Sequence, residues 1–327
     1  MLEIFRRNLF INSLLLLPYI FIVRIGTLIN PVSVKLPQES NILQELIFNN
    51  ITHPIAQSIC ANLLIFVQAI LINNICNKNK LAREITLFSG LFYVLFVSLI
   101  PENLPLSNAL IANTFIILAV RNLFETYKNA QASAYIFNTG IMIGLASLYY
   151  YPYFTFLVFG IISLLMIRSF KIIEKFQFFI GFGIPYFLVS TYRYWYDMPF
   201  ADFNFIKSIL LKLPILKADG LVVTYISIGV LMLGVVFSFI NYGNLTAKKA
   251  IQSQKKIDII YVFMLFCFMS MIVFETNIYT HLLTLAFPLA TLTGISVSES
   301  KKVIFYEFLH LFLLGLIFIS QFKLINF

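Results

Sequence analysis

The sequence predicts an all-α integral membrane protein, a polytopic helical bundle of about eleven transmembrane helices. Of the 327 residues, 60% are hydrophobic and only 11% are charged, whereas a soluble domain has about 25% charged residues. The mean hydropathy is +0.90. These values exclude a soluble enzyme, a nucleic-acid-binding protein and a disordered linker, because too few polar side chains remain to cover a soluble core. Runs such as Val262–Val273 are apolar on every face, which favours helices over the alternating strands of a membrane barrel.

A membrane helix needs about 20 apolar residues, and eleven segments of the sequence are apolar enough to qualify. The predicted spans are 8–29, 56–75, 85–100, 107–123, 131–149, 152–168, 176–193, 220–241, 257–274, 278–296 and 303–323. No small-residue cleavage site follows the first apolar run, so we interpret it as a retained helix rather than a signal peptide. We expect residues 1–327 to form a single transmembrane domain.

The basic residues predict the orientation of these spans. With the N-terminus in the cytoplasm, sixteen of the 23 lysines and arginines lie at cytoplasmic ends and six at outer ends, while Arg24 lies within the first span. This distribution follows the positive-inside rule. The net charge of +9 is then explained by contact with an anionic leaflet of the bilayer, and no nucleic-acid partner is expected.

Two outer loops, 30–55 and 194–219, are longer than the others. In the first loop, the segment NILQELIFNNI (41–51) has apolar residues at helical spacing with polar residues opposite. In the second, apolar residues from Phe203 to Leu213 again recur at helical spacing among lysines. Both patterns predict an amphipathic helix lying in the plane of the outer interface.

Three stretches resemble an uncharacterised family of Bacteroidota inner-membrane proteins. They are LSNALIANTFIILAVRNLFETY (106–127), IFNTGIMIGLASLYYYPYFTFLVFGIISLLMIRSF (136–170) and FIGFGIPYFLVSTYRYWYD (179–197). The resemblance implies a multi-pass protein of the bacterial inner membrane. It implies no activity, because the family has none established.

The architecture is also similar to that of multi-span glycosyltransferases that use polyprenyl-phosphate-linked sugars. Those enzymes share a first span, an outer loop with an in-plane helix, and tight helical hairpins of the kind found in 148–170. They place an acidic residue in the first outer loop as a general base. This similarity implies that Glu39 or Glu45 is a catalytic base, or a ligand to a divalent cation that holds a lipid phosphate. The alternative is that both are solvated charges, since the chain lacks the adjacent acidic pair of those enzymes.

Arg24 lies about two-thirds of the way along the first predicted span. A charged residue within a span is costly and is therefore a candidate functional residue. Two interpretations remain: Arg24 binds a lipid phosphate near the outer leaflet, or its long side chain extends to the outer interface.

Arg193 lies at the outer end of the seventh predicted span, within the run Tyr-Arg-Tyr-Trp-Tyr. It could hold a phosphate while Tyr194 or Trp195 stacks on a sugar. The alternative is a belt of aromatic residues at the level of the headgroups.

No metal site is predicted, because His53, His281 and His310 have no metal-ligand spacing. We expect His281 and His310 to form hydrogen bonds between helices. No cofactor is expected, apart from the divalent cation that an outer-loop glutamate could hold.

Three functions are consistent with the sequence. The first is binding or processing of a polyprenyl-phosphate-linked sugar on the periplasmic side of the inner membrane. The second is a non-catalytic scaffold or assembly subunit of a cell-envelope complex, with a membrane-protein partner. The third is a transporter, which the absence of an internal inverted repeat disfavours.

Overall fold

A computed structural model describes residues 2–7, 9–32, 42–168, 171–198, 222–247, 249–274, 278–300 and 303–322. These residues form helices joined by turns, and none of them lies in a β-strand. The helices are α1 (Leu2–Arg6), α2 (Phe10–Val23), α3 (Gly26–Ile29), α4 (Ile42–Asn50), α5 (Pro54–Lys78), α6 (Phe88–Ser98), η1 (Pro101–Asn103), α7 (Asn108–Glu125), α8 (Ser133–Tyr149), η2 (Tyr151–Thr155), α9 (Phe156–Ile167), α10 (Ile172–Trp195), α11 (Val222–Ile240), α12 (Tyr242–Thr246), α13 (Ile251–Val273), α14 (Ile278–Glu299) and α15 (Val303–Phe322).

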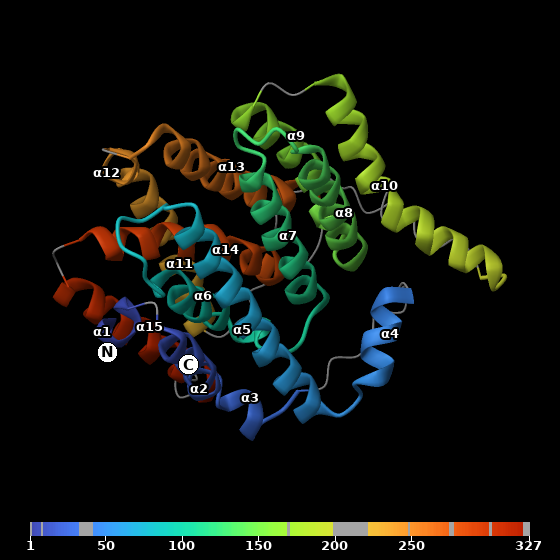
Figure 1. The fold of residues 1–327 in the computed structure, drawn as a ribbon. Coiled ribbons are helices and arrows are strands. Elements are labelled where there is room, and N and C mark those ends of the chain that lie inside the picture. The colour runs from blue at the N-terminus through green and yellow to red at the C-terminus, as the bar shows by residue number, and fades with distance from the viewer. Residues whose placement is uncertain are drawn as a thin grey trace.

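Each of the eleven predicted spans coincides with a helix or a helix pair in the bundle (Figure 1). Six of these helices, α5, α10, α11, α13, α14 and α15, are long and apolar enough by length and composition to cross a membrane. Three shorter apolar helical segments, 10–23, 88–98 and 151–167, add to them. The chain is therefore a multi-pass helical membrane protein.

The centre of the bundle is formed by α6 and α14. Every residue of α6 is buried, and so are most residues of α14. Gly294 of α14 packs so closely on α6 that an added Cβ would lie 2.6 Å from the Cα of Ser89. The other helices surround this pair (Figure 1), and their outward side chains, such as Phe308 and Leu311, remain apolar.

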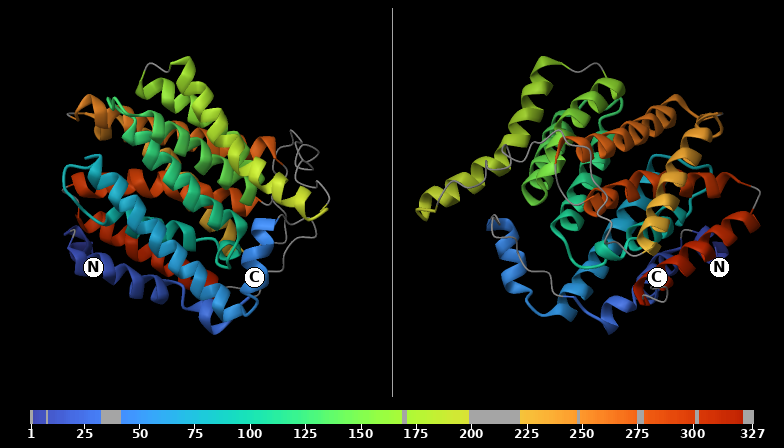
Figure 2. Two further views of the ribbon diagram at one scale, coloured as in Figure 1. Left: turned by 45° about the vertical axis from the view of Figure 1, so that its right-hand side comes forward. Right: turned by 180° about the vertical axis from the view of Figure 1, so that it is seen from behind.

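Helices α8 and α10 form a second close contact through glycine. A Cβ added at Gly144 would lie 2.5 Å from the carbonyl oxygen of Phe182, and a Cβ at Gly181 would meet the carbonyl oxygen of Phe137. Glycine at these positions lets the two backbones approach directly. From this contact α10 extends away from the rest of the bundle (Figure 2).

Both predicted histidine contacts between helices are confirmed. His281 of α14 lies 3.3 Å from the hydroxyl of Ser270 on α13. His310 of α15 lies 2.8 Å from the hydroxyl of Tyr19 on α2. Buried ring nitrogens need such partners, so the histidines stabilise the packing of the spans.

Three predictions differ from the structure or lie outside it. The first span is not continuous, since α2 ends at Val23 and a short α3 begins at Gly26. The helix predicted for 257–274 begins earlier, because α13 starts at Ile251. The helix predicted within the first outer loop is present as α4, whereas the helix predicted for 203–213 lies outside the described residues.

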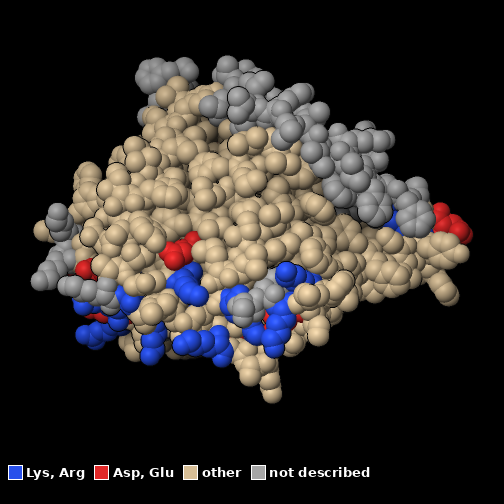
Figure 3. Space-filling view, turned by 90° about the horizontal axis from the view of Figure 1, so that it is seen from above, with Lys and Arg blue, Asp and Glu red and all other residues tan. Residues whose placement is uncertain are grey.

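Basic side chains gather at one end of the bundle. That end holds α1 with Arg7 after it, the connections α5–α6, α7–α8 and α9–α10, and the start of α13. Figure 3 shows lysines and arginines collected along one edge of the molecule, beside a broad face without charges. Towards the opposite end, the described part of the chain contains two arginines, Arg193 and the buried Arg24.

Candidate functional site

Arg24 lies at the break between α2 and α3, and its side chain is completely buried. The guanidinium Nε donates a hydrogen bond to Oδ1 of Asn62 at 2.7 Å, and Nη1 donates to the hydroxyl of Ser98 at 3.3 Å. The second terminal nitrogen, Nη2, donates to the carbonyl oxygen of Leu104. Of the two interpretations of Arg24, the extension of its side chain to the outer interface is therefore wrong, because α5, α6 and the connection after η1 supply acceptors inside the bundle.

All three acceptors of Arg24 are neutral oxygen atoms. Among the described residues, no carboxylate forms an ion pair with Arg24, although four other ion pairs occur. A buried cation is usually paired with an anion, because desolvation of the charge costs several kcal/mol. Arg24 is therefore a positive charge that the surrounding helices solvate but do not neutralise.

The break beside Arg24 is held open by side chains from α5 and α15. Gln321 of α15 accepts a hydrogen bond from the Gly26 N–H at 2.9 Å and donates one to the Val23 carbonyl at 2.7 Å. Ser58 of α5 donates to the Thr27 carbonyl at 3.1 Å. These bonds satisfy backbone groups that the interrupted helix leaves without partners.

A cavity of about 400 Å³ adjoins this break. Its walls come from α3, α5, the η1–α7 connection and the end of α15, and its lining residues are Gly26, Thr27, Asn30, Val32, Ser58, Pro101, Leu104, Pro105, Ser320, Gln321 and Phe322. None of these described lining residues is charged. Leu104 belongs both to the cavity wall and to the hydrogen-bond shell of Arg24, so the arginine charge lies directly behind the wall.

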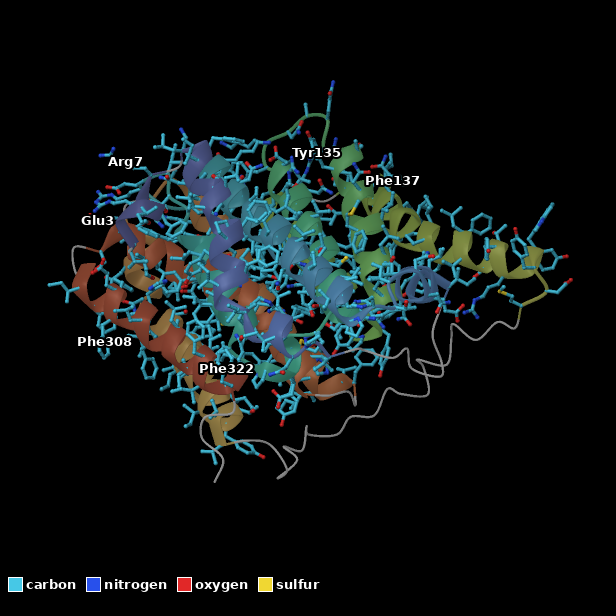
Figure 4. The ribbon with its side chains drawn as sticks, turned by 90° about the horizontal axis from the view of Figure 1, so that it is seen from below. Glu3, Arg7, Tyr135, Phe137, Phe308 and Phe322 are labelled. Carbon is cyan, nitrogen blue, oxygen red and sulfur yellow. The ribbon has the colours of Figure 1, made fainter. Side chains whose placement is uncertain are left out.

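This cavity lies at the end of the bundle opposite the basic residues. Figure 4 places Phe322, which lines the cavity, well away from Glu3 and Arg7. The segments that line the cavity are the end of α3, the start of α5, η1 with the connection to α7, and the end of α15, and all of them meet at that end.

The structure does not bring Arg193 to Arg24. Arg193 is buried near the C-terminal end of α10, where the Met198 N–H bonds to its carbonyl at 2.9 Å. Tyr194 and Trp195 are exposed, with 73% and 79% of their surfaces accessible. In Figures 1 and 2 this end of α10 lies apart from α3 in each view. The residues predicted to bind phosphate and to stack on a sugar therefore do not form one site: Arg24 lies at the α2–α3 break, whereas Arg193, Tyr194 and Trp195 lie at the end of α10.

Glu45 lies on α4 and is half-buried. Helix α4 is joined to α8 by the Gln44 side chain, which donates to the Tyr149 carbonyl at 2.9 Å. Glu39 lies outside the described residues. In the part of the chain that the structure describes, no three His, Cys, Asp or Glu side chains form a group that could hold a metal ion.

Sequence reasoning identified Arg24 but missed the residues that surround it. Asn62 and Gln321 gave a usable signal, because each is a polar side chain within an apolar span. Ser98 and the Leu104 carbonyl gave none, since a serine or a backbone carbonyl near the end of a span is common. Their role becomes visible only when α6 and η1 are placed against α2.

Comparison with known proteins gives a family but no activity. No curated protein matches the chain significantly. A crystal structure of ArnT from Cupriavidus metallidurans bound to undecaprenyl phosphate is similar, with a TM-score of 0.49 and 12% sequence identity over 88% of this chain. The chain spans 56% of the length of that protein. A family model described as a family of unknown function, DUF6427, matches residues 29–327. The chain therefore belongs to the DUF6427 family.

Proposed function

We propose that this protein binds the phosphate headgroup of a polyprenyl-phosphate-linked sugar in the cavity beside Arg24. The observation that carries the proposal is the buried Arg24 guanidinium with three neutral acceptors behind the cavity wall. The cavity volume of about 400 Å³ falls within the range of about 300–1,000 Å³ that is typical of ligand sites.

The magnitude of the electrostatic effect supports an anionic ligand. Two opposite unit charges about 8 Å apart attract by roughly 2 kcal/mol at an effective dielectric constant of about 20. That energy corresponds to more than a tenfold gain in affinity. A neutral ligand would gain nothing from the charge of Arg24, so the cavity should discriminate in favour of phosphate.

The proposal places the cavity on the periplasmic side of a bacterial inner membrane. Eleven spans with the N-terminus in the cytoplasm put the basic end of the bundle inside, and the Arg24 cavity is at the other end. The resemblance of 106–127, 136–170 and 179–197 to a Bacteroidota family supports a bacterial inner membrane as the location. The single domain 1–327 then contains the bilayer-spanning helices and both outer loops.

Glycosyl transfer is the reaction that we propose for the bound lipid. A hydroxyl of an acceptor would attack C1 of the sugar, the bond from C1 to the phosphate oxygen would break, and polyprenyl phosphate would leave. Glu39 or Glu45 would take the proton of the hydroxyl. Arg24 would stabilise the phosphate, and Arg193, Tyr194 and Trp195 would hold the acceptor or a distal part of the lipid at the end of α10.

The binding step can be tested without disturbing Arg24. Asn30 lines the cavity and is exposed, and its side chain forms no hydrogen bond in the structure. Asn30→Asp adds a negative charge at the cavity with almost no change in shape. We expect native mass spectrometry of detergent-solubilised protein with added undecaprenyl phosphate to show at least tenfold weaker binding for this variant.

Asn49→Asp is the matched control, since Asn49 is exposed on α4 and lies outside the cavity lining. It should bind undecaprenyl phosphate as the wild type does. Equal binding by both variants and the wild type would contradict the proposal.

Catalysis needs a separate experiment. A Glu39→Gln/Glu45→Gln variant should still bind undecaprenyl phosphate but fail to complement a deletion strain. Full complementation would sink the catalytic part of the proposal. If that variant complements and wild-type protein extracted from its own membrane carries a stoichiometric protein partner instead of lipid, the scaffold function is favoured.

A further inference from the structure

A second cavity, of about 450 Å³, lies at the basic end of the bundle. It is bounded by the α5–α6 connection on one side and by the start of α13 on the other. We name it the basic pocket, and its lining residues are Lys78, Asn79, Lys80, Ala82, Arg83, Lys249, Ala250, Gln252 and Ser253. Four of these nine residues are cations, and none is acidic.

Two of the four cations are already neutralised by neighbouring carboxylates. Lys78 pairs with Glu125 at 2.7 Å, and Lys249 pairs with Glu299 at 2.8 Å. Lys80 and Arg83 form no ion pair with any described carboxylate. The pocket therefore presents an excess of positive charge that its own walls leave uncompensated.

A further cation lies directly behind the pocket. Lys256 is almost fully buried, and its ammonium group donates to Oδ1 of Asn79 at 2.5 Å. The same group lies over the rings of Phe124 and Tyr127, at 5.5 and 5.8 Å from their centroids. Because Asn79 lines the pocket, the charge of Lys256 reinforces the positive potential there.

The backbone around the pocket is held in place by both walls. The Ser253 hydroxyl donates to the Lys80 carbonyl at 3.1 Å, and the Lys249 ammonium donates to the Leu81 carbonyl at 2.5 Å. These bonds fix the start of α13 against the α5–α6 connection. The first residues of α13 then contribute the positive end of a 23-residue helix to the pocket. No side chain caps that end of the helix.

We infer that the basic pocket binds a phosphate group at the end of the bundle opposite Arg24. Lys80 and Arg83 would contact the phosphate oxygens, and the amide groups at the start of α13 would donate to them. The phosphate could belong to an anionic lipid headgroup of the cytoplasmic leaflet or to a soluble phosphate compound, since both carry the same group. This inference does not depend on the proposed function, because the two cavities share no residue.

Gln252 allows a test with little disturbance of the fold. It lines the pocket, is exposed, and has no side-chain hydrogen bond in the structure. Gln252→Glu places a carboxylate among the cations without changing the size of the side chain. Gln131→Glu is the matched control, because Gln131 is exposed at the α7–α8 turn of the same end and does not line the pocket.

Two probes distinguish the sources of the phosphate. Isothermal titration calorimetry of the detergent-solubilised full chain with pyrophosphate measures the binding of a soluble phosphate compound. Native mass spectrometry with phosphatidylglycerol measures the binding of a lipid that carries the phosphate in its headgroup. We expect at least one probe to bind the wild type and the Gln131→Glu control equally, and to bind Gln252→Glu at least tenfold more weakly. Pyrophosphate binding would assign a soluble ligand, and binding of phosphatidylglycerol alone would assign a lipid. Failure of both probes to bind, or equal binding by both variants, would overturn the inference.

Discussion

The two cavities differ in how they present positive charge. Beside α3, one buried arginine is solvated by three neutral oxygens and lies behind a cavity wall whose described residues carry no charge. In the basic pocket, lysines and an arginine line the surface themselves, and two of them pair with carboxylates. The cavities have similar volumes, about 400 and 450 Å³, so size does not distinguish them.

Because of this difference, the charge of Arg24 should matter for the stability of the fold, whereas the charges of the basic pocket should matter for ligand binding. The Arg24 charge is bound into the fold, because three helices or connections supply its acceptors. Lys80 and Arg83 of the basic pocket are exposed and unpaired among the described residues, so their charges contribute little to stability and remain available to a ligand. Substitution of Arg24 should therefore lower mainly the stability of the fold, whereas substitutions in the basic pocket should lower mainly ligand affinity.

The largest expected effect is that of Arg24→Leu. It leaves the acceptors on Asn62, Ser98 and Leu104 buried without their donor, at about 1–3 kcal/mol each, and this cost is partly offset because the buried charge is removed. We expect a loss of about 3 kcal/mol in unfolding free energy, measured by equilibrium denaturation in mixed micelles. Lys80→Ala/Arg83→Ala should lose less than about 0.5 kcal/mol, as surface substitutions usually do. Equal losses of unfolding free energy in the two variants would contradict the proposed difference between the two cavities.

Lys256→Met should have an intermediate effect. It removes the donor to Asn79, which costs about 1–3 kcal/mol, but it also removes the desolvation cost of a buried ammonium group. We expect a net destabilisation of about 1 kcal/mol in the same denaturation experiment. Lys255→Met is the control, since Lys255 is half-buried and forms no ion pair with a described carboxylate. A greater loss for Lys255→Met would count against the role of Lys256.

A double-mutant cycle tests the helix break that frames the Arg24 cavity. A methyl group at Gly26 would lie 2.6 Å from Oε1 of Gln321, so Gly26→Ala should cost about 1–2 kcal/mol by overpacking. Gln321→Ala should cost about 1 kcal/mol through its two lost hydrogen bonds. The double variant should lose less than the sum, by about 0.5 kcal/mol.

Gly183→Ala is the control for this cycle, because nothing lies within 4 Å of a Cβ built there. It should be no less stable than the wild type, because alanine in a helix interior is favoured over glycine by about 0.5–1 kcal/mol. Strict additivity at Gly26 and Gln321 would show that the two residues do not act together at the break.

The smallest expected effect concerns pH at the basic pocket. Burial lowers the pKa of Lys249 below its ordinary value of 10.5, although Glu299 opposes the shift. The charge of Lys249 is therefore lost at a lower pH than that of an exposed lysine. Its unfavourable contribution to stability is present below the folded-state pKa and fades as the pH rises towards 10.5.

If pyrophosphate binds to the pocket, its affinity should fall about twofold over the same window as the charge of Lys249 is lost. Lys249→Arg should retain its affinity there, because arginine stays protonated. Both proteins are titrated at each pH, so that a change in the ionisation of pyrophosphate affects both affinities equally and their ratio reports only on Lys249. Parallel pH profiles for the two proteins would exclude Lys249 as the cause.

Much of the fold could be predicted from the sequence, because apolar runs and basic ends are local signals. The eleven predicted spans coincide with helices, and α4 matches the amphipathic pattern of 41–51. The break after Val23 was missed, since Arg24 stabilises it through Asn62 and Leu104, which are distant in sequence. The pocket between Arg83 and Gln252 was missed for the same reason: each wall alone is an ordinary basic loop.

The site could be predicted only in part. Arg24 was identifiable because a charge within an apolar span is costly. Its partners and the cavity depend on how α2, α5, α6 and α15 pack, and no spacing along the chain encodes that arrangement. Arg193 seemed equivalent to Arg24 by residue type, yet it lies on a helix that extends away from the bundle.

The most direct test of the account compares two ligands on the unaltered protein. Undecaprenyl phosphate and undecaprenol differ only in the phosphate group, so their relative affinity measures the effect of the Arg24 charge on the cavity. Competition in native mass spectrometry should show undecaprenyl phosphate bound at least tenfold more tightly, with the preference reduced in Asn30→Asp and retained in Gln252→Glu. Equal affinity for the phosphate and the alcohol would contradict the claim that Arg24 makes this cavity selective for an anion.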